Sequence, residues 1–526
     1  MKKYFVAFTL LFISLSALAQ TSRNSATGAR TQTAPTAQPS RNSTIVKAGA
    51  ERMKIGPNMF GYFIEHFDNQ IYGGIYDPGN PLSDEDGFRT DVIEAVKELK
   101  VPIMRWPGGC FASTYHWKDA IGPERRPSFD KTWGVEEPNT FGTDEFVKWC
   151  RKVGCEPYIV TNAGTGSIEE MSDWVEYCNL NIGYWGRRRI SNGFPEPHNV
   201  KYWCIGNENL APWEMQYKTP QEWGPLVREG AKMMLVTDKD IKLGASSLTT
   251  REAMIPLLQN AGHLLDFIAF HCGWEGTGKS FVEIMMETGM PEAQISSAIA
   301  YLNEAGYGDG KMKLAIDEWQ LRGWIHPGMG DPKHGFDYEA RRLNDVASTY
   351  TLSDAVYAAC FLNTCLRHCD VIDFTCFSTV VNTRGAIFVH PQGIVKRVIY
   401  YALQMYSNYL LPYVVPTEEH VGTLTHGDKS TGILDVVLTS DEEGKKFVYA
   451  IANKDPENSQ SLSLDFKGLG KKVPKKVQAR ILSGKSADDY NDIGSEDRVK
   501  PYDTNLAVKD GTVTIPAHSV TFITIE

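Results

Sequence analysis

The sequence from residue 202 to residue 208 is Tyr202-Trp203-Cys204-Ile205-Gly206-Asn207-Glu208, a short apolar run that ends on a carboxylate. A second run of this kind is Leu314-Ala315-Ile316-Asp317-Glu318-Trp319. Short continuous apolar runs bounded by polar or turn residues are typical of strands that are covered on both faces. In an (α/β)8 barrel, a carboxylate at the carboxyl end of a strand points into the mouth where substrates bind. The two stretches therefore predict a parallel barrel with Glu208 and Glu318 at its mouth.

Apolar runs alternate with helical patterns throughout residues 59–400. The predicted strands are Met59–Ile64, Val101–Trp106, Glu156–Thr161, Lys201–Ile205, Lys242–Ala245, Leu265–His271, Lys313–Asp317 and Val371–Phe377. The predicted helices between them are Thr90–Leu99, Thr143–Val153, Ser167–Cys178, Pro220–Val236 and Ser353–Arg367. This alternation predicts a parallel sheet, closed as a (β/α)8 TIM barrel. A doubly wound open sheet is the alternative.

Polar side chains at the ends of the predicted strands favour the barrel. In chain order these ends are Glu65-His66, Arg105-Trp106-Pro107-Gly108-Gly109, Asn162, Asn207-Glu208, Ser246-Ser247, His271, Glu318-Trp319 and Ser378. A purely structural sheet does not need such a concentration of polar groups at one edge. The pattern therefore predicts a binding or catalytic site at the carboxyl ends of the strands.

Two carboxylates on opposing strands fit the hydrolysis of a glycosidic bond. A retaining glycosidase needs one carboxylate as nucleophile and a second, protonated carboxyl that acts first as acid and then as base. The fourth and seventh strands lie across the mouth of a barrel, so Glu208 and Glu318 can face each other over a sugar. Asn207 can donate to a sugar 2-hydroxyl, and Arg105 can hold Glu318 ionised. The alternative for the two glutamates is a structural ion pair.

The sequences on either side of the predicted barrel have other compositions and hydrophobic patterns. Residues 20–43 contain no aromatic or large aliphatic side chain and predict a flexible linker. Residues 44–58 predict an N-terminal strand that joins a second domain, an antiparallel β-sandwich over residues 401–526. The predicted sandwich strands are Ile433–Leu438, Phe447–Ala452, Leu462–Phe466, Val477–Leu482, Thr512–Ile515 and Val520–Ile525.

The first 19 residues have the pattern of a cleavable secretory signal. Lys2 and Lys3 precede an apolar segment from Phe5 to Leu15, and Ala17-Leu18-Ala19 forms a small-residue cleavage site. The apolar segment is too short for a membrane span, and no cysteine precedes Cys110, which excludes a lipid-anchored cysteine near the new N-terminus. We therefore expect a periplasmic or secreted protein without membrane insertion.

Composition and spacing disfavour several other classes of protein. A net charge of −10 without a basic run argues against nucleic acid as a partner. The ten cysteines form no CxxC motif, so we expect buried free thiols, with Cys150–Cys155 or Cys365–Cys369 as the nearest candidate pairs. Ser167 and Glu170 fit a capping box better than a dinucleotide loop. No second histidine follows Glu65-His66 at helical spacing, which argues against a zinc hydrolase. The motif G-x-S-x-G is absent, which removes the usual signature of a serine hydrolase.

Several motifs resemble those of a known family. Gly206-Asn207-Glu208 and Asp317-Glu318-Trp319 are similar to the acid/base and nucleophile signatures of the large clan of retaining barrel glycosidases. A narrower resemblance, to the family 51 α-L-arabinofuranosidases, runs from about residue 44 to the C-terminus. It is carried by Phe63-Ile64-Glu65-His66, Ile71-Tyr72-Gly73-Gly74-Ile75-Tyr76, Met104-Arg105-Trp106-Pro107-Gly108-Gly109, Tyr115-His116-Trp117-Lys118-Asp119, Asn199-Val200-Lys201-Tyr202-Trp203, Asn382-Thr383-Arg384-Gly385 and His390-Pro391.

The resemblance implies an exo-acting retaining enzyme that removes terminal arabinofuranosyl groups from arabinan or arabinoxylan fragments, with no metal or organic cofactor. It makes Glu208 the acid/base and Glu318 the nucleophile. Residues that match positions holding the furanose or orienting the nucleophile are Glu65, Arg105, Asn207 and His271.

Two positions depart from the family pattern. Cys110 stands where better-known members have an asparagine that contacts the sugar, and Gly273 stands where members often have a tyrosine. These departures keep another glycone open, such as a galactofuranoside, a xyloside or an internal glucan bond. A carbohydrate-binding protein without catalysis is a further alternative, and the oligomeric state is open, a homo-oligomer included.

Overall fold

The computed structural model describes residues 42–273, 276, 278–324, 326, 333 and 335–526. The predicted signal peptide at residues 1–19 lies outside the described residues, as does the predicted linker except for its last two residues.

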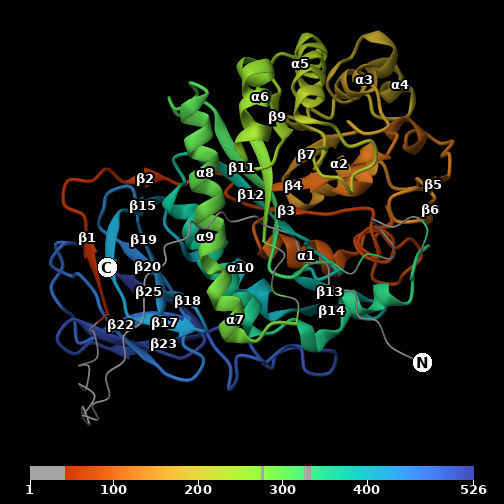
Figure 1. Cartoon of the computed structure of the whole chain (residues 1–526). Coiled ribbons are helices and arrows are strands. Elements are labelled where there is room, and N and C mark those ends of the chain that lie inside the picture. The colour runs from red at the N-terminus through yellow and green to blue at the C-terminus, as the bar shows by residue number, and fades with distance from the viewer. Residues whose placement is uncertain (1–41, 274–275, 277, 325, 327–332, 334) are drawn as a thin grey trace, which may run out of the picture. The chain divides into compact units, whose positions relative to one another are not determined.

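Eight parallel strands close into a barrel, which confirms the predicted fold class and makes the open-sheet alternative wrong (Figure 1). Each predicted barrel strand forms within a few residues of its expected bounds. The barrel strands are β3 (Phe60–Phe63), β4 (Ile103–Trp106), β7 (Glu156–Thr161), β8 (Tyr202–Ile205), β9 (Lys242–Ser246), β10 (Phe267–Gly273), β11 (Lys313–Gln320) and β12 (Ile372–Ser378). The pairing of β12 with β3 closes the ring.

The inside of the barrel is filled by a layer of apolar side chains. Three aromatic rings meet edge to face: Phe374 lies 5.2 Å from both Tyr158 and Phe267, measured between ring centroids. Such a layer makes the barrel a packed core rather than a pore. The Tyr158 hydroxyl donates to Oδ2 of Asp317 at 2.9 Å. The layer therefore supports one of the acidic residues at the barrel mouth.

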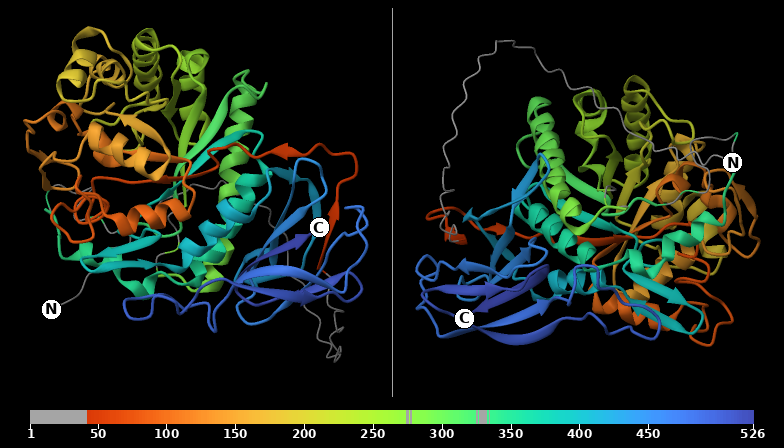
Figure 2. Two further views of the ribbon diagram at one scale, coloured as in Figure 1. Left: turned by 180° about the vertical axis from the view of Figure 1, so that it is seen from behind. Right: turned by 60° about the horizontal axis from the view of Figure 1, so that its bottom comes forward.

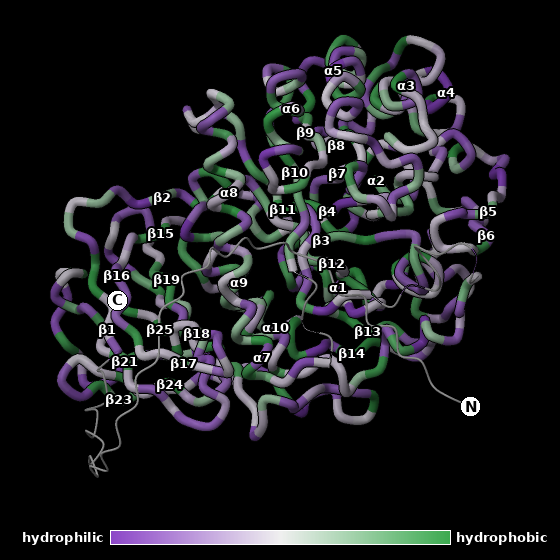
Figure 3. Tube along the Cα trace, in the orientation of Figure 1, coloured by the Kyte–Doolittle hydropathy of each residue, from purple (hydrophilic) through white to green (hydrophobic). Residues whose placement is uncertain are grey.

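Helices cover the outside of the barrel, and all five predicted helices form. The helices are α1 (Thr90–Glu98), α2 (Thr143–Val153), α3 (Ile168–Asn179), α4 (Gly183–Ser191), α5 (Pro220–Thr237), α6 (Arg251–Ala261), α7 (Phe281–Met286), α8 (Met290–Glu304), α9 (Leu352–Arg367) and α10 (Val398–Tyr409). Ser167 caps α3 by accepting from the backbone N–H of Glu170 at 3.0 Å, as its S-x-x-E spacing predicts. Figure 3 shows green hydrophobic segments along the strands and helices, and purple hydrophilic segments in the outer loops.

The C-terminal region contains two sheets that share one hydrophobic cluster, as in a sandwich. The seven-stranded sheet has the order β2 (Met53–Lys54), β15 (Tyr413–Val415), β19 (Leu434–Ser440), β20 (Phe447–Asn453), β25 (Ser519–Ile525), β22 (Lys476–Leu482) and β23 (Tyr502–Ala507). The four-stranded sheet has the order β16 (Thr417–His420), β1 (Asn42–Val46), β21 (Gln460–Ser463) and β24 (Thr512–Ile515). The sequence analysis missed β15, β16 and β23, because short or half-polar strands carry a weak hydrophobic pattern.

Three short hairpins complete the strands. They are β5 (Ser128–Asp130) with β6 (Val135–Glu137), β13 (Ile387–His390) with β14 (Gly393–Lys396), and β17 (Thr423–His426) with β18 (Lys429–Gly432).

The N-terminal strand β1 lies among strands from the end of the chain, where Figure 1 shows it in red beside blue. It pairs antiparallel with β16 and parallel with β21. The strand begins at Asn42, two residues before the predicted start of the N-terminal strand at residue 44. The Asn42 side chain donates to the carbonyl of Ser461 and accepts from the backbone N–H of Gly422. These tertiary contacts satisfy the hydrogen-bonding groups of the Asn42 side chain, although the sequence around Asn42 does not indicate a strand.

The predicted domain boundary after residue 400 falls inside α10. This helix packs against α9, and the Tyr406 hydroxyl donates to Oδ1 of Asn363 on α9 at 2.7 Å. In both views of Figure 2 the blue C-terminal strands lie beside these helices. Arg367 of α9 forms an ion pair of 2.9 Å with Asp435 of β19. The sequence analysis did not predict α10, because its tyrosine-rich sequence hides the helical period.

All ten cysteines lie in the described residues, and all are free, which confirms the expected free thiols. None of the helices that the structure describes combines the length and the apolar composition needed to cross a lipid bilayer.

Candidate active site

A single buried cation, Arg105 on β4, joins three strands at the barrel mouth. Its Nη1 donates to Oε2 of Glu318 at 2.7 Å, and its Nη2 donates to Oδ1 of Asn207 at 2.5 Å. Its Nε lies 3.0 Å from Oδ2 of Asp317, and its guanidinium carbon lies 4.7 Å from the centre of the Phe63 ring. Burial acts to lower the pKa of Arg105, but the charges of Asp317 and Glu318 outweigh burial and raise this pKa. The guanidinium therefore stays charged.

An irregularity in β11 allows two consecutive acidic residues to reach Arg105. Ile316 pairs with Thr375 of β12 and Trp319 pairs with Phe377, so two residues of β11 oppose one residue of β12. In a regular strand, consecutive side chains point to opposite faces of the sheet. The bulge removes this alternation, so Asp317 and Glu318 both contact the same guanidinium.

A tight turn after β8 positions Glu208. Gly206 has a φ of +74° and Glu208 itself has a φ of +45°, both in the left-handed region. A Cβ added to Gly206 would lie 1.9 Å from Oδ1 of Asn209, so only glycine fits there. Oε2 of Glu208 accepts from Nε1 of Trp213 at 2.7 Å. Non-glycine residues with positive φ concentrate at functional sites, because the strain has to be held by the surrounding structure.

His271 on β10 lies between the two glutamates that the sequence analysis paired. Its Nδ1 lies 2.7 Å from Oε1 of Glu208 and 3.6 Å from Oε2 of Glu318. Those two oxygens are therefore less than about 6.5 Å apart, the lower limit for the carboxyl pair of inverting glycosidases. Burial lowers the pKa of His271, but the charges of Glu318 and Glu208 outweigh it and raise the pKa to about 10. A protonated imidazole thus bridges the pair.

The two glutamates have opposite pKa shifts in this arrangement. Burial raises the pKa of Glu318, and the charge of Glu208 adds to this, against the opposing effects of His271 and Arg105. Burial also acts to raise the pKa of Glu208, but His271 and the Trp213 N–H outweigh it and lower this pKa. The pair is tightly coupled, so one proton can move between its members when a neighbour changes.

Glu65, at the end of β3, lies fully buried beside the glycine turn that follows β4. Its Oε1 accepts from the backbone N–H of Phe111 at 3.1 Å, and its Oε2 has no hydrogen-bond partner among the described residues. A Cβ on Gly108 would lie 2.5 Å from Cγ of Glu65, and one on Gly109 would lie 3.0 Å from Oε2 of Glu318. The two glycines therefore let the backbone approach both carboxyl groups closely.

The structure brings together all six predicted site residues, and it adds others that the sequence analysis did not single out. The added residues are Asp317, Trp213 and Glu214. Asp317 carried a signal, since an acid inside an apolar strand needs a buried partner. Trp213 and Glu214 lie in an irregular turn, where no periodic pattern marks a functional residue.

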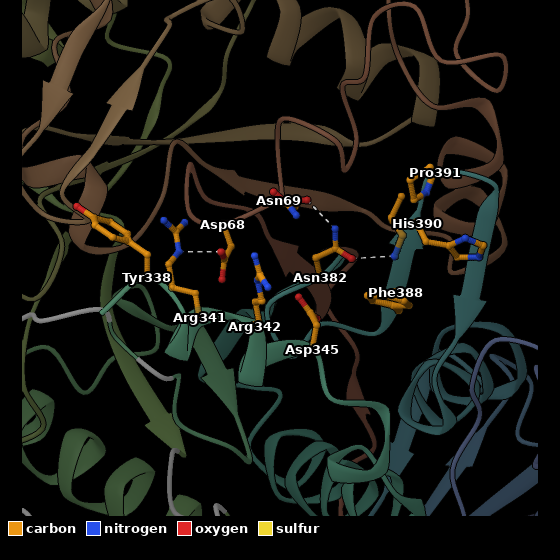
Figure 4. A pocket seen from close by; sticks show the side chains of 11 residues that line it. Asp68, Asn69, Tyr338, Arg341, Arg342, Asp345, Asn382, Phe388, His390 and Pro391 are labelled. Carbon is orange, nitrogen blue, oxygen red and sulfur yellow. Dashed lines mark hydrogen bonds and ion pairs between the residues drawn. The ribbon is translucent and has the colours of Figure 1, made fainter. Parts of the chain in front are cut away.

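A cavity of about 570 Å³ lies elsewhere, beside the loops after β3 and β12 (Figure 4). Asp68 and Arg341 form an ion pair of 2.8 Å at its wall, and Asn382 accepts from the backbone N–H of Val389. None of the six predicted site residues lines this cavity. The two glutamates that the sequence analysis predicted as the catalytic pair lie at the barrel mouth with Arg105 and His271 instead.

Comparison with known proteins identifies the family. An α-L-arabinofuranosidase 1 domain matches residues 95–278, and an α-L-arabinofuranosidase C-terminal domain matches residues 317–519. The α-L-arabinofuranosidase C of Emericella nidulans is 36% identical over 420 residues, covering 74% of this chain and 81% of that protein. The chain belongs to the family 51 α-L-arabinofuranosidases.

Other family members agree with this assignment. The intracellular exo-α-(1→5)-L-arabinofuranosidase of Halalkalibacterium halodurans is 32% identical and covers 79% of this chain and 85% of that protein. The crystal structure of the Thermotoga maritima α-L-arabinofuranosidase in complex with arabinose superposes with a TM-score of 0.82, at 31% identity, over 92% of this chain and all of that chain. The protein is thus an α-L-arabinofuranosidase, a glycoside hydrolase that acts on an arabinose-containing carbohydrate.

Replacing Arg105 by lysine tests the dependence of the site on one planar cation. Lysine cannot contact Glu318, Asn207 and Asp317 together, because its ammonium is a single point. We expect kcat on an aryl arabinofuranoside to fall by about 100-fold or more, as loss of orientation of this kind does. Arg480→Lys, in an exposed ion pair with Asp503, is the matched control and should keep its activity. A kcat for Arg105→Lys close to that of this control would contradict the proposed dependence.

Proposed function

We propose that this α-L-arabinofuranosidase is a retaining, exo-acting enzyme that removes terminal arabinofuranosyl groups from arabinan or arabinoxylan fragments. The observation that carries the retaining mechanism is the short separation between Glu208 and Glu318, below about 6.5 Å. An inverting enzyme needs room for a water molecule between its carboxyl groups, whereas a retaining nucleophile must reach the sugar carbon directly.

In the first proposed step, a carboxylate oxygen of Glu318 attacks the anomeric carbon of the arabinofuranosyl group. The bond from this carbon to the leaving oxygen breaks, and the leaving oxygen takes the proton of Glu208. The products of this step are a covalent glycosyl ester on Glu318 and a free alcohol. Arg105 contacts Glu318 and not Glu208, so the permanent charge serves the group that has to react as an anion.

In the second proposed step, water attacks the same carbon from the side that the alcohol left. Glu208, now a carboxylate, takes a proton from this water, and the ester bond to Glu318 breaks. Two displacements at one carbon return it to its original configuration. Glu208 thus regains its proton and Glu318 its negative charge, which readies the pair for another cycle.

The protonation of the ligand-free pair is the reverse of what the first step needs. The ligand-free site favours the anion on Glu208, because protonated His271 and Trp213 both donate to it. We infer that a bound furanoside reverses this order. A leaving-group oxygen beside Glu208 and the exclusion of water favour the neutral carboxyl, while the contact of Arg105 with Glu318 keeps the nucleophile ionised.

Glu65 and Asn207 are proposed to hold the furanose. Oε2 of Glu65 is buried without a hydrogen-bond partner among the described residues, and a sugar hydroxyl would supply one. Asn207 uses its Oδ1 on Arg105 and one amide N–H on Glu214, so its second amide N–H remains for a sugar hydroxyl. His271, which contacts Glu208 and lies near Glu318, is proposed to orient the pair.

Glu318→Ala tests the nucleophile. We expect kcat to fall by several orders of magnitude, because the covalent route is lost. Azide should restore turnover of an aryl arabinofuranoside and give a glycosyl azide of inverted configuration, since azide replaces the missing carboxylate.

NMR of the wild-type reaction supplies the matching control. The first arabinose released should have the configuration of the substrate. An inverted first product would contradict the retaining mechanism, and an azide product of retained configuration from Glu318→Ala would exchange the roles of the two glutamates.

Glu208→Ala tests the acid/base. We expect a small effect on activated aryl arabinofuranosides and a large loss on arabino-oligosaccharides, because a poor leaving group needs the proton most. The measurement is kcat/KM across leaving groups of rising pKa. Equal losses on all substrates would argue against an acid role for Glu208.

We further propose that the protein is exported, on the strength of Lys2, Lys3, the apolar segment that follows and the Ala17-Leu18-Ala19 site. Expression of the full chain in a Gram-negative host should give a mature protein that starts after Ala19, detected as the intact mass of the periplasmic or secreted fraction. Lys2 and Lys3 changed to glutamate should abolish this processing. If the unchanged chain stays unprocessed in the cytoplasm of this host, export is refuted.

A further inference from the structure

Glu214 is a further carboxyl group beside the proposed catalytic pair, in the turn that follows β8. It is only 4% exposed. Its Oε1 accepts from Nδ2 of Asn207 at 3.1 Å, and its Oε2 accepts from Oγ of Ser113 at 2.5 Å. Sγ of Cys110 lies within 4.8 Å of an oxygen of the same carboxyl group. None of the proposed catalytic steps uses Glu214, although it contacts Asn207 and lies near Glu208.

Hydrogen bonds link Glu214 to the proposed nucleophile. Glu214 accepts from Asn207, Asn207 accepts from Arg105, and Arg105 donates to Glu318. The Asn207 side chain is 1% exposed, and both ends of its amide are held by groups that fix its orientation. Because Arg105 can only donate, Oδ1 of Asn207 must face it, and Nδ2 must face Glu214. The Glu214 carboxyl group therefore decides where the remaining amide N–H of Asn207 points.

Glu214 is also close to the proposed acid/base. One oxygen of Glu214, one oxygen of Glu208 and Sγ of Cys110 all lie within 4.8 Å of one another. At this separation, in a site shielded from water, a negative charge on one carboxyl group disfavours ionisation of the other. The link to Glu208 acts through charge, whereas the link to Glu318 acts through hydrogen bonds.

We propose that Glu214 is a positioning residue for both catalytic glutamates: it orients the Asn207 amide through a hydrogen bond, and its negative charge helps Glu208 to keep the proton that the leaving group needs. This inference rests on the proposed acid role of Glu208. It assigns a function to the polar group formed by Cys110, Ser113 and Glu214, in which the hydroxyl donates to the carboxyl group and the thiol lies beside it.

The titration of Glu214 fits this role. Burial, and then the charge of Glu208, raise the pKa of Glu214 to about 7, against the opposing donors Cys110, Ser113 and Asn207. Glu214 therefore becomes an anion as the pH rises through neutrality, and its charge then acts against the ionisation of Glu208. The charged or titratable groups that also face the two carboxyl groups are Glu65, Arg105, Cys110, His271, Glu318 and His326.

Glu214→Gln separates the two effects. Glutamine keeps an oxygen that accepts from Asn207 but carries no charge, so Glu208 should lose its proton at lower pH. For an arabino-oligosaccharide, we expect the alkaline midpoint of the kcat profile to fall by about one pH unit or more. For an aryl arabinofuranoside with a good leaving group, the alkaline midpoint should move much less, because that reaction needs little acid assistance.

Glu214→Ala removes the hydrogen-bond acceptor as well as the charge. We expect kcat to fall about tenfold or more below that of Glu214→Gln on both substrates, since Asn207 loses its orientation. Glu229→Gln, on the surface of α5 next to Lys232, is the matched control for loss of a carboxylate and should reproduce the wild-type profile. Thermal unfolding of each variant shows whether the site remains folded, and the isosteric glutamine variant tests the charge effect even if the alanine variant does not fold.

A Glu214→Gln profile that coincides with the wild-type profile on the oligosaccharide would overturn the inference, provided that Glu208→Ala shows the leaving-group dependence of an acid. Failure of that dependence would instead overturn the proposed role of Glu208. The two results are distinguishable, because the first compares pH midpoints in Glu214 variants and the second compares leaving groups in a Glu208 variant.

Discussion

The buried guanidinium of Arg105 is the contact on which the active site depends. A charge that is fully removed from water is stable only when it is paired and hydrogen-bonded, and Arg105 meets this condition through Glu318, Asp317 and Asn207. These partners come from the turn after β8 and from β11, while Arg105 belongs to β4. The cation thus needs the whole barrel to be closed before its partners can meet. Removing Asp317 or Glu318 would take away one of the two negative charges that compensate Arg105, so the site and the fold constrain each other.

The barrel provides the geometry for this contact through departures from regular structure. The bulge in β11 presents Asp317 and Glu318 to one side, and the left-handed turn at Gly206 to Glu208 presents Glu208 opposite them. Gly108 and Gly109 have no Cβ, so the backbone can approach the side chains of Glu65 and Glu318 closely. The aromatic layer of Tyr158, Phe267 and Phe374 supports the site from below. The barrel strands and their aromatic layer therefore hold the bulge in β11 and the left-handed turn after β8 in place.

Protons in the site are shared rather than fixed on single residues. His271 lies near both Glu208 and Glu318, and Glu214 lies near Glu208 and Asn207. In such a group, the protonation of each member depends on the charges of the others. In the proposed cycle, a bound sugar changes these charges and contacts, and it therefore changes which of Glu208 and Glu318 carries the proton. This coupling gives a physical reason for several acidic residues within one small site.

The sequence by itself determined the barrel, the paired glutamates and their neighbours Arg105, Asn207, Glu65 and His271, because strand ends in a parallel barrel all meet at one mouth. Only the tertiary structure decided how these residues contact one another. The bulge that brings Asp317 beside Glu318, the turn that brings Trp213 and Glu214 to Glu208, and the helix α10 that crosses the expected domain boundary depend on register and packing between distant segments. Local periodicity reports which residues are buried, but contacts between segments far apart in the chain decide what the buried polar groups touch.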